Sequence, residues 1–200
     1  ECMLCSFKAE EKLYSDLTTP EEYAQFVAEK IGLTAAQRGS ALHLVMQYLD
    51  FGRTGSKQEI AGQIRELVDR EFIDKLQGEA ADPERLAAFF RSELGRELTA
   101  ARAQREFKFS MLVPAADYYP GVEGEELLLQ GVVDCWFETE DGITVLDFKS
   151  DRVDGTTVEQ RARDYGPQLE AYANALTRLT GRPVTRRVLW FFALDRAVEV

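Results

Sequence analysis

The stretch GVVDCWFETEDGITVLDFK, residues 131–149, carries most of the information in this sequence. It contains two runs rich in β-branched and aromatic residues, separated by Glu140-Asp141-Gly142, and this pattern predicts two strands joined by a short turn. Side chains alternate between the two faces of a strand, so Asp147 and Lys149 share one face. The segment therefore predicts a β-hairpin with charged side chains in a mostly apolar sheet.

The position of the turn decides which residue lies opposite Asp134. With the turn centred after Glu140, Asp134 lies opposite Asp147. With the turn centred one residue later, Asp134 lies opposite Lys149. Cross-strand partners project to the same face, so both registers bring two carboxylates and one ammonium together. Charges in an apolar sheet are retained only when they are paired with each other, with a metal or with a ligand.

Two interpretations of this cluster are open. The first is a structural ion pair between Asp147 and Lys149 near a strand end. The second is a metal site, because two carboxylates on adjacent strands supply the hard oxygen ligands that Mg²⁺ prefers. Bound Mg²⁺ polarises a phosphate oxygen and lowers the pKa of a bound water, while a nearby lysine positions or activates that water. The second interpretation therefore predicts a site that hydrolyses phosphodiester bonds.

Around this hairpin, the chain divides into a mainly helical part, residues 1–104, and a β-β-β-α-β part, residues 105–200. Helix-capping sequences predict helices that begin at four places. These are Thr19-Pro-Glu-Glu22, Thr34 to Gln37, Ser56 to Glu59 and Asp82-Pro83. The second part is predicted to contain strands 106–113, 127–137, 143–148 and 184–194, and a helix 157–180 with a kink or break at Gly166-Pro167. The expected fold is α/β with an N-terminal helical appendage.

Composition limits the possible functions. The chain has 24 basic and 35 acidic residues, for a net charge of −11, which argues against a broad basic surface that holds nucleic acid. Nucleic acid remains a possible substrate, because sites for divalent metals need carboxylates. Three cysteines are too few for a disulfide framework, which favours a reducing cytosol. No apolar run approaches the roughly 18 residues that a membrane helix needs.

Five short motifs, in this order, resemble those of the PD-(D/E)XK nuclease superfamily, and within it the RecB-like nuclease domains. They are Gly39-Ser-Ala-Leu-His43 (G-x-x-x-H), the strand glutamate Glu106, Gly131 to Asp134 (G-x-x-D), Asp147-Phe-Lys149 (D-x-K) and Gln168-Leu-Glu-Ala-Tyr172 (Q-x-x-x-Y). The resemblance implies a restriction-endonuclease-like core, a mixed β-sheet flanked by helices.

The resemblance also implies a role for each matching residue. His43, Asp134 and Asp147 would bind the metal, with the Phe148 backbone carbonyl as a further ligand. Lys149 would be the catalytic lysine, acting with the two aspartates.

The resemblance implies site roles for Gln168, Tyr172 and Glu106 as well. These three residues and His43 each have a simpler structural interpretation. Gln168 and Tyr172 are four residues apart on one helix face, where they would order Lys149 or contact the DNA backbone, or else form ordinary amphipathic surface. Glu106 would join the site or be a surface strand residue. His43 would otherwise be a packing or surface residue.

Two longer stretches, RGSALHLVMQYLDF (residues 38–51) and YGPQLEAYANAL (residues 165–176), resemble the C-terminal nuclease domain of AddA-type helicase–nuclease subunits. This implies a Mg²⁺-dependent DNA nuclease, in which Mn²⁺ can substitute. It would cleave single strands delivered by a helicase during double-strand break repair and recombination in the bacterial cytoplasm. An AddB-type subunit is the expected partner, no membrane is involved, and ATP would bind only to the helicase part of a longer polypeptide, of which residues 1–200 are one domain.

Relatives with an iron–sulfur cluster use four cysteines in a pattern that Cys2, Cys5 and Cys135 do not fill, so we expect no cluster in this chain. Two other hypotheses stand beside the main one. The chain could be a catalytically silent nuclease-like module for DNA binding or subunit docking, or a free-standing nuclease of the phage exonuclease kind. The segment Arg178 to Arg187 is consistent with a solvated face, a DNA contact or a partner contact.

Overall fold

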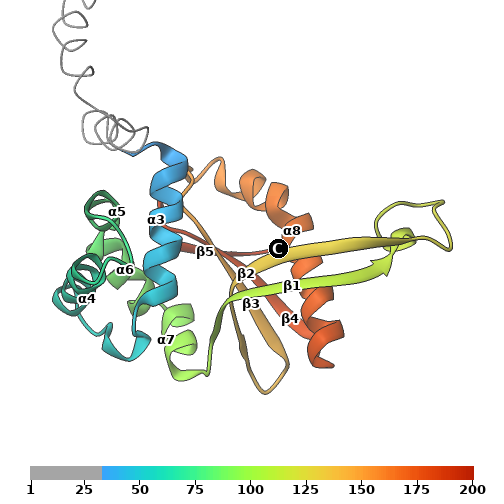
Figure 1. Ribbon diagram of the computed structural model, residues 1–200, viewed down its shortest axis with the longest axis horizontal. Coiled ribbons are helices and arrows are strands. Elements are labelled where there is room, and N and C mark those ends of the chain that lie inside the picture. The colour runs from blue at the N-terminus through green and yellow to red at the C-terminus, as the bar shows by residue number, and fades with distance from the viewer. Residues whose placement is uncertain (1–32) are drawn as a thin grey trace, which may run out of the picture.

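A computed structural model describes residues 33–200, which form five helices, a five-stranded sheet and one long helix packed against that sheet (Figure 1). The helices before the sheet are α3 (Ala35–Tyr48), α4 (Lys57–Asp69), α5 (Lys75–Ala80), α6 (Pro83–Arg91) and α7 (Glu93–Ala100). They are followed by β1 (Gln104–Pro114), β2 (Glu126–Glu138), β3 (Ile143–Lys149), α8 (Val158–Thr180), β4 (Val184–Phe191) and β5 (Arg196–Glu199).

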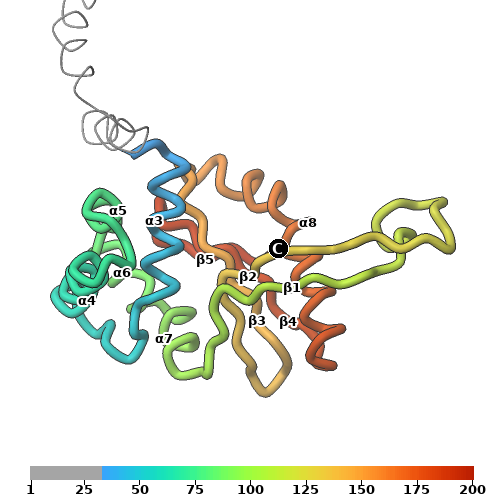
Figure 2. The backbone as a smooth tube through the Cα atoms, in the orientation of Figure 1, coloured from blue at the N-terminus to red at the C-terminus, as the bar shows by residue number. Residues whose placement is uncertain are grey.

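The strands lie in the order β1-β2-β3-β4-β5, and the sheet is mixed. β3 and β4 are parallel, as the α8 crossover between them requires, and all other neighbours are antiparallel. Helices α3 to α7 pack against one face, where Leu146 and Phe148 join their core. α8 packs against the other face, over Val145 and Leu189. The backbone trace in Figure 2 shows α3 and α8 on either side of the strands. This arrangement confirms the expected mixed sheet flanked by helices.

The helix starts follow the capping residues. Thr34 and Ser56 form complete capping boxes at the start of α3 and α4, and Asp82 caps α6 with Pro83 at its first position. The helix expected from Thr19 lies outside the described residues. α5 was not anticipated, although Asp74 and Gln77 form a capping box before it.

The expected single helix after Asp82 is in fact two helices, α6 and α7. Ser92 ends the first and caps the second by accepting a hydrogen bond from the Gly95 N–H. A Cβ atom on Gly95 would lie 2.1 Å from the Phe89 carbonyl oxygen, so only glycine allows the two helices to meet so closely. The apolar spacing continues across the junction, which is why the sequence pattern did not reveal it.

Two further outcomes concern the second half. α8 is one helix through Pro167, so the predicted break is wrong, while a kink there stays a prediction. Buried residues on both sides of the proline, such as Ala162 and Leu169, pack against the sheet. The last predicted strand ends at Phe191 rather than Leu194, and the chain then turns back to form β5. The extra strand is short, and its alternating pattern of four residues is too brief to recognise.

The segment from Arg178 to Arg187 is largely neutralised by acidic residues of this chain. Three of its arginines are ion-paired with carboxylates: Arg178 with Asp117 at 2.6 Å, Arg182 with Glu138 at 2.5 Å, and Arg186 with Glu97 at 2.8 Å and Glu199 at 3.0 Å. This pairing favours the solvated-face interpretation. Within residues 33–200, none of the helices combines the length and the apolar character needed to span a bilayer.

Candidate active site

The hairpin of β2 and β3 adopts the first of the two predicted registers. Cys135 pairs with Leu146 and Glu138 with Ile143, which centres the turn between Glu140 and Asp141 and places Asp134 beside Asp147. Regular pairing stops at Cys135, however. The Asp134 carboxylate then accepts a hydrogen bond from the Phe148 N–H at 2.9 Å, so a side chain takes the place of the next backbone acceptor.

A second irregularity lies on the other side of Asp134, between β1 and β2. Arg105 pairs with Cys135 and Phe107 with Val133, but Glu106 and Asp134 between them form no ladder pair. Glu106 has a φ of +50°, in the left-handed region that residues other than glycine rarely adopt. Alternation of faces is interrupted here, because Val133 packs on the α8 side and Cys135 on the side of α3 to α7. The charged side chains thus meet at a break in the sheet. We had predicted that they would meet because side chains alternate regularly along paired strands.

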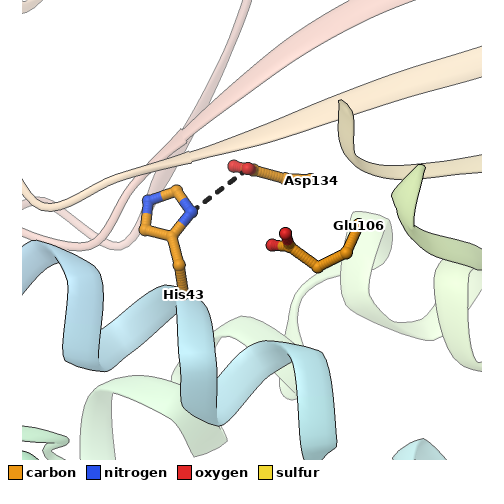
Figure 3. Close-up of side chains that lie close together, drawn as sticks. All are labelled: His43, Glu106 and Asp134. Carbon is orange, nitrogen blue, oxygen red and sulfur yellow. Dashed lines mark ion pairs between the residues drawn. The ribbon is translucent and has the colours of Figure 1, made fainter. Parts of the chain in front are cut away.

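Helix α3 brings His43 to this break. The His43 Nδ1 atom lies 3.1 Å from Asp134 Oδ1, and the Glu106 carboxylate points toward the same space (Figure 3). One ligand atom each from His43, Glu106 and Asp134 lies within 4.8 Å of the others. Glu106, for which we predicted only a general site role, therefore stands in the group that could hold a metal ion.

The glycine of the G-x-x-x-H motif lies at a close contact between α3 and the residue after β3. A Cβ atom on Gly39 would lie 2.8 Å from the Ser150 Oγ atom, directly after the end of β3. Gly39 precedes His43 by one helical turn, so both residues lie on the same face of α3. The motif therefore combines a close helix–strand contact with an imidazole that faces the carboxylates.

Asp147 and Lys149 lie on the α8 side of the break. The Lys149 Nζ atom is 2.5 Å from Asp147 Oδ2 and donates a hydrogen bond to Gln168 Oε1 at 3.3 Å. The Gln168 Nε2 atom in turn donates to the Tyr172 hydroxyl at 2.7 Å. The structure therefore brings both residues of the Q-x-x-x-Y motif to the lysine.

The glycine of the G-x-x-D motif makes room for Tyr172. A Cβ atom on Gly131 would lie 2.7 Å from the Phe109 ring and 3.0 Å from the Tyr172 ring. These two aromatic rings pack edge to face against each other over β2. Gly131 is therefore required for α8 to lie close enough for Gln168 to reach Lys149.

The acidic groups of the site oppose one another's ionisation. Burial, together with the charge of Asp134, raises the pKa of Asp147 to about 6, although Lys149 acts in the opposite direction. Burial and Asp134 also raise the pKa of Glu106. Burial disfavours the charged form of His43, but its hydrogen bond to Asp134 and the charges of both aspartates outweigh this effect and raise its pKa.

These observations test whether the residues suit a divalent cation. Asp147 is 2% exposed, and its Oδ2 atom accepts no hydrogen bond, since its contact with Lys149 is an ion pair without hydrogen-bond geometry. Carboxylate oxygens with one imidazole nitrogen form a donor set that Mg²⁺ or Mn²⁺ accepts. A cation here would neutralise crowded negative charge, so the site fits one. The ligand role of the Phe148 carbonyl stays a prediction, because the described contact of Phe148 at this site is made by its N–H.

A cleft of 720 Å³ opens onto the break. His43, Glu106 and Asp134 line it, and residues of α3 and of the segment after β3 form its walls. Arg38 and Arg152 lie among these wall residues and supply positive charge to an otherwise acidic site. The half-buried carboxylates of Glu106 and Asp134 are therefore accessible from this cleft, whereas Asp147 and Lys149 are not among its lining residues.

Comparison with known proteins bears on the family of this chain. Residues 13–199 match the sequence profile of the PD-(D/E)XK nuclease superfamily. A protein of Clostridium botulinum (strain 657 / Type Ba4), named as an ATP-dependent helicase/nuclease subunit, is 35% identical over 181 residues, which cover 88% of this chain. The protein of the same name from Acetivibrio thermocellus is 40% identical over 173 residues, which cover 84% of this chain. In both cases the match spans only 14% of the relative's length. The resemblance found from the five motifs is thereby confirmed.

Proposed function

The chain belongs to the PD-(D/E)XK nuclease superfamily, and we propose that it is a metal-dependent nuclease domain that hydrolyses phosphodiester bonds of DNA. One observation carries the proposal: the cluster of His43, Glu106 and Asp134 stands beside the Asp147–Lys149 pair, at the mouth of a cleft. A structural ion pair accounts for Asp147 and Lys149 alone. It does not account for three further ionisable groups, half-buried, that converge next to this pair.

His43, Glu106 and Asp134 would hold a divalent cation, with Asp147 and the Phe148 carbonyl completing its ligands. Such a cation supplies charge for a non-bridging phosphate oxygen and lowers the pKa of a bound water. Mg²⁺ is the ion we propose, and Mn²⁺ is expected to replace it, because the ligands are mostly oxygen with one imidazole nitrogen.

Lys149 would orient the water that attacks the phosphorus. Its ammonium is held by the ion pair with Asp147 and donates a hydrogen bond to Gln168, which leaves at least one of its three N–H groups without a hydrogen-bond acceptor among the described residues. That N–H is available to a water or to a phosphate oxygen. The lysine side chain is only 11% exposed, so its charge acts at short range in a poorly hydrated space.

The names of the relatives suggest the setting in which the domain works. We propose that residues 1–200 form one nuclease domain of a longer helicase–nuclease polypeptide. The helicase part would bind ATP and deliver single-stranded DNA, with an AddB-type partner protein, in break repair and recombination in the cytoplasm. The supporting observation is that the relatives are named as helicase/nuclease subunits and that the match occupies a small share of their length.

Calorimetric titration with Mg²⁺ and Mn²⁺, followed by cleavage of labelled single-stranded DNA, tests the proposal. The wild-type chain is expected to bind the metals and to cleave DNA only when one is present. Asp134→Ala and Asp147→Ala should lose both properties, whereas Lys149→Ala should bind metal but lose cleavage. Asp69→Ala, at the exposed end of α4, is the matched control.

The outcomes separate the nuclease from its main alternative. DNA binding without cleavage by the wild-type chain, in both Mg²⁺ and Mn²⁺, would favour a silent DNA-binding or docking module. Cleavage that survives in Asp147→Ala would remove the proposed site from the reaction altogether.

A further inference from the structure

We propose that Tyr165 is a positioning residue, whose aromatic ring holds the Lys149 ammonium in place for the reaction. The inference rests on the proposed nuclease function, but its evidence is independent of the metal cluster. The Lys149 Nζ atom lies 3.7 Å from the centroid of the Tyr165 ring, well within the range of a cation–π interaction. Tyr165 precedes the Q-x-x-x-Y motif and is not one of the motif residues.

The ammonium needs more than its two oxygen partners to be fixed. A lysine side chain has four rotatable bonds, and its head is a compact charge without directional preference. It is restrained by the ion pair with Asp147 Oδ2 at 2.5 Å and by the hydrogen bond that it donates to Gln168 Oε1 at 3.3 Å. The ring of Tyr165 is a third restraint, and it attracts the charge without using a further N–H group as an oxygen acceptor would. The remaining N–H is thereby kept for the substrate.

Tyr165 is itself held by two charged neighbours. Its hydroxyl donates a hydrogen bond to Asp151 Oδ2 at 2.8 Å and accepts one from Arg161 Nη2 at 2.9 Å. The Arg161 guanidinium also lies 4.7 Å from the ring centroid. Asp151 follows Lys149 by two residues, so the loop after β3 and the first half of α8 are joined through this tyrosine.

The position of Tyr165 on α8 explains why it can act together with Gln168. The two residues are three apart and therefore neighbours on one helix face. α8 continues through Pro167 between them, so both side chains reach Lys149 from the same helix. Burial and the hydrogen bond to Asp151 raise the pKa of Tyr165 to about 12, so its ring is uncharged at neutral pH.

The test varies the electron density of the ring while its shape stays nearly constant. Tyr165 is replaced by Phe, by difluorinated Phe and by pentafluorinated Phe through amber suppression, and kcat and KM are measured on single-stranded DNA. Tyr165→Phe is expected to keep at least half of the wild-type kcat. Along the fluorinated series kcat should fall by about tenfold or more, since misplacing a catalytic group by about 1 Å can cost about 100-fold. KM should change less than about threefold.

A second pair of variants provides a steric test and its control. Tyr165→Leu removes the ring and should resemble the pentafluorinated variant. Tyr119→Leu removes a tyrosine that is 62% exposed in the connection between β1 and β2, and it should keep wild-type kcat. A flat kcat along the fluorinated series, or equal losses in Tyr165→Phe and Tyr165→Leu, would overturn the proposal.

An NMR measurement makes the result independent of cleavage. The chain has seven lysines, so selective ¹³C labelling of lysine Cε gives few signals, and Lys149→Arg assigns the one of interest. Ring current should shift this signal upfield in the wild type and in Tyr165→Phe, and the shift should vanish in Tyr165→Leu. If the wild type cleaves no DNA but shows the shift, the nuclease proposal fails while the contact stands. If the shift is absent in the wild type, the positioning proposal fails by itself.

Discussion

Asp134 joins two parts of the fold through its two carboxylate oxygens. Oδ2 accepts the Phe148 N–H at 2.9 Å, and Oδ1 lies 3.1 Å from the His43 Nδ1 atom on α3. The carboxylate thus fills the position that a backbone carbonyl would occupy if β2 and β3 stayed paired. One side chain therefore closes the sheet and supplies the charge of the site.

The two roles of Asp134 can be separated by substitution. Asp134→Asn keeps an oxygen acceptor for the Phe148 N–H but removes the charge, so it should lose metal binding and cleavage with a change in stability below about 1 kcal/mol. Asp134→Ala leaves a buried N–H unpaired and should cost about 1–3 kcal/mol in the free energy of unfolding. Urea denaturation without metal compares the two variants. Equal stability losses would mean that the Phe148 hydrogen bond contributes little.

The raised pKa of Asp147 predicts how the stability of the metal-free chain depends on pH. A carboxyl group whose pKa is higher in the folded than in the unfolded chain binds its proton more tightly when folded, so it adds stability as the pH falls. With a pKa of about 6 in the folded chain, the free energy of unfolding should rise by about 1 kcal/mol between pH 7 and pH 5. Asp147→Asn should lack this rise.

The raised pKa of His43 acts in the same direction, so both chains in this comparison carry His43→Gln. Denaturation at several pH values between 7 and 5 measures the difference between them. Parallel pH curves for the two chains would show that the pKa of Asp147 is not raised by the fold.

The same groups predict the opposite pH dependence for the metal. Carboxylate ligands must be deprotonated to bind a cation, so Mg²⁺ or Mn²⁺ affinity should weaken as the pH falls below about 6, and binding should release protons. Calorimetry in two buffers of different ionisation enthalpy counts these protons. Metal at 100 times its dissociation constant should stabilise the wild-type chain by about 2.7 kcal/mol, a gain that ethylenediaminetetraacetate (EDTA) removes. Constant affinity from pH 7 to 5 would argue against Asp147 as a ligand.

Two glycines, one in β2 and one in α4, should respond oppositely to alanine. Gly131→Ala places a methyl group against the Phe109 and Tyr172 rings and should cost about 1–3 kcal/mol of stability. It should also lower kcat, because a displaced Tyr172 no longer orients Gln168 through the hydrogen bond between them. Gly62→Ala in α4 meets only the end of the Arg65 side chain, at 4.0 Å, and removes a glycine from a helix, so it should stabilise the chain by about 0.5–1 kcal/mol. Thermal denaturation of both variants checks the contrast.

Tyr172→Phe examines the hydrogen bond that orients Gln168. The Phe variant keeps the ring packing against Phe109 but loses the hydroxyl that accepts from Gln168 Nε2 at 2.7 Å. We expect a severalfold fall in kcat on single-stranded DNA and a stability change below about 1.5 kcal/mol. Gln168→Ala should reduce kcat at least as much. A rise in KM with an unchanged kcat would instead indicate that this pair contacts the DNA backbone.

Much of the fold could be predicted because the signals are local. Thr34, Ser56 and Asp82 cap their helices through atoms of the next three residues, and the turn at Gly142 separates two strongly apolar strands. The junction at Ser92 escaped prediction because its apolar pattern is continuous. β5 escaped prediction because it is formed by only four residues whose partners lie in β4.

The candidate site was predictable in part. The D-x-K and G-x-x-D motifs predict a cluster of charged side chains in both of the hairpin registers that we considered. The contribution of Glu106 to the group with His43 and Asp134 depends on a positive φ and a gap in the β1–β2 ladder. No periodicity in the sequence encodes either feature, since alternation describes only regular strands.

By itself, the sequence determined which residues are available for chemistry, where the capped helices α3, α4 and α6 begin, and that charges meet near Asp147, because these depend on neighbours within a few positions of the chain. Only the tertiary structure decided that β2 leaves β3 at Asp134, that α3 delivers His43 to this opening, and that Tyr165 covers the Lys149 ammonium. These relationships join residues far apart in sequence. They follow from the packing of two helical layers on a twisted sheet, in which close contacts at Gly39 and Gly131 set how near each helix can come.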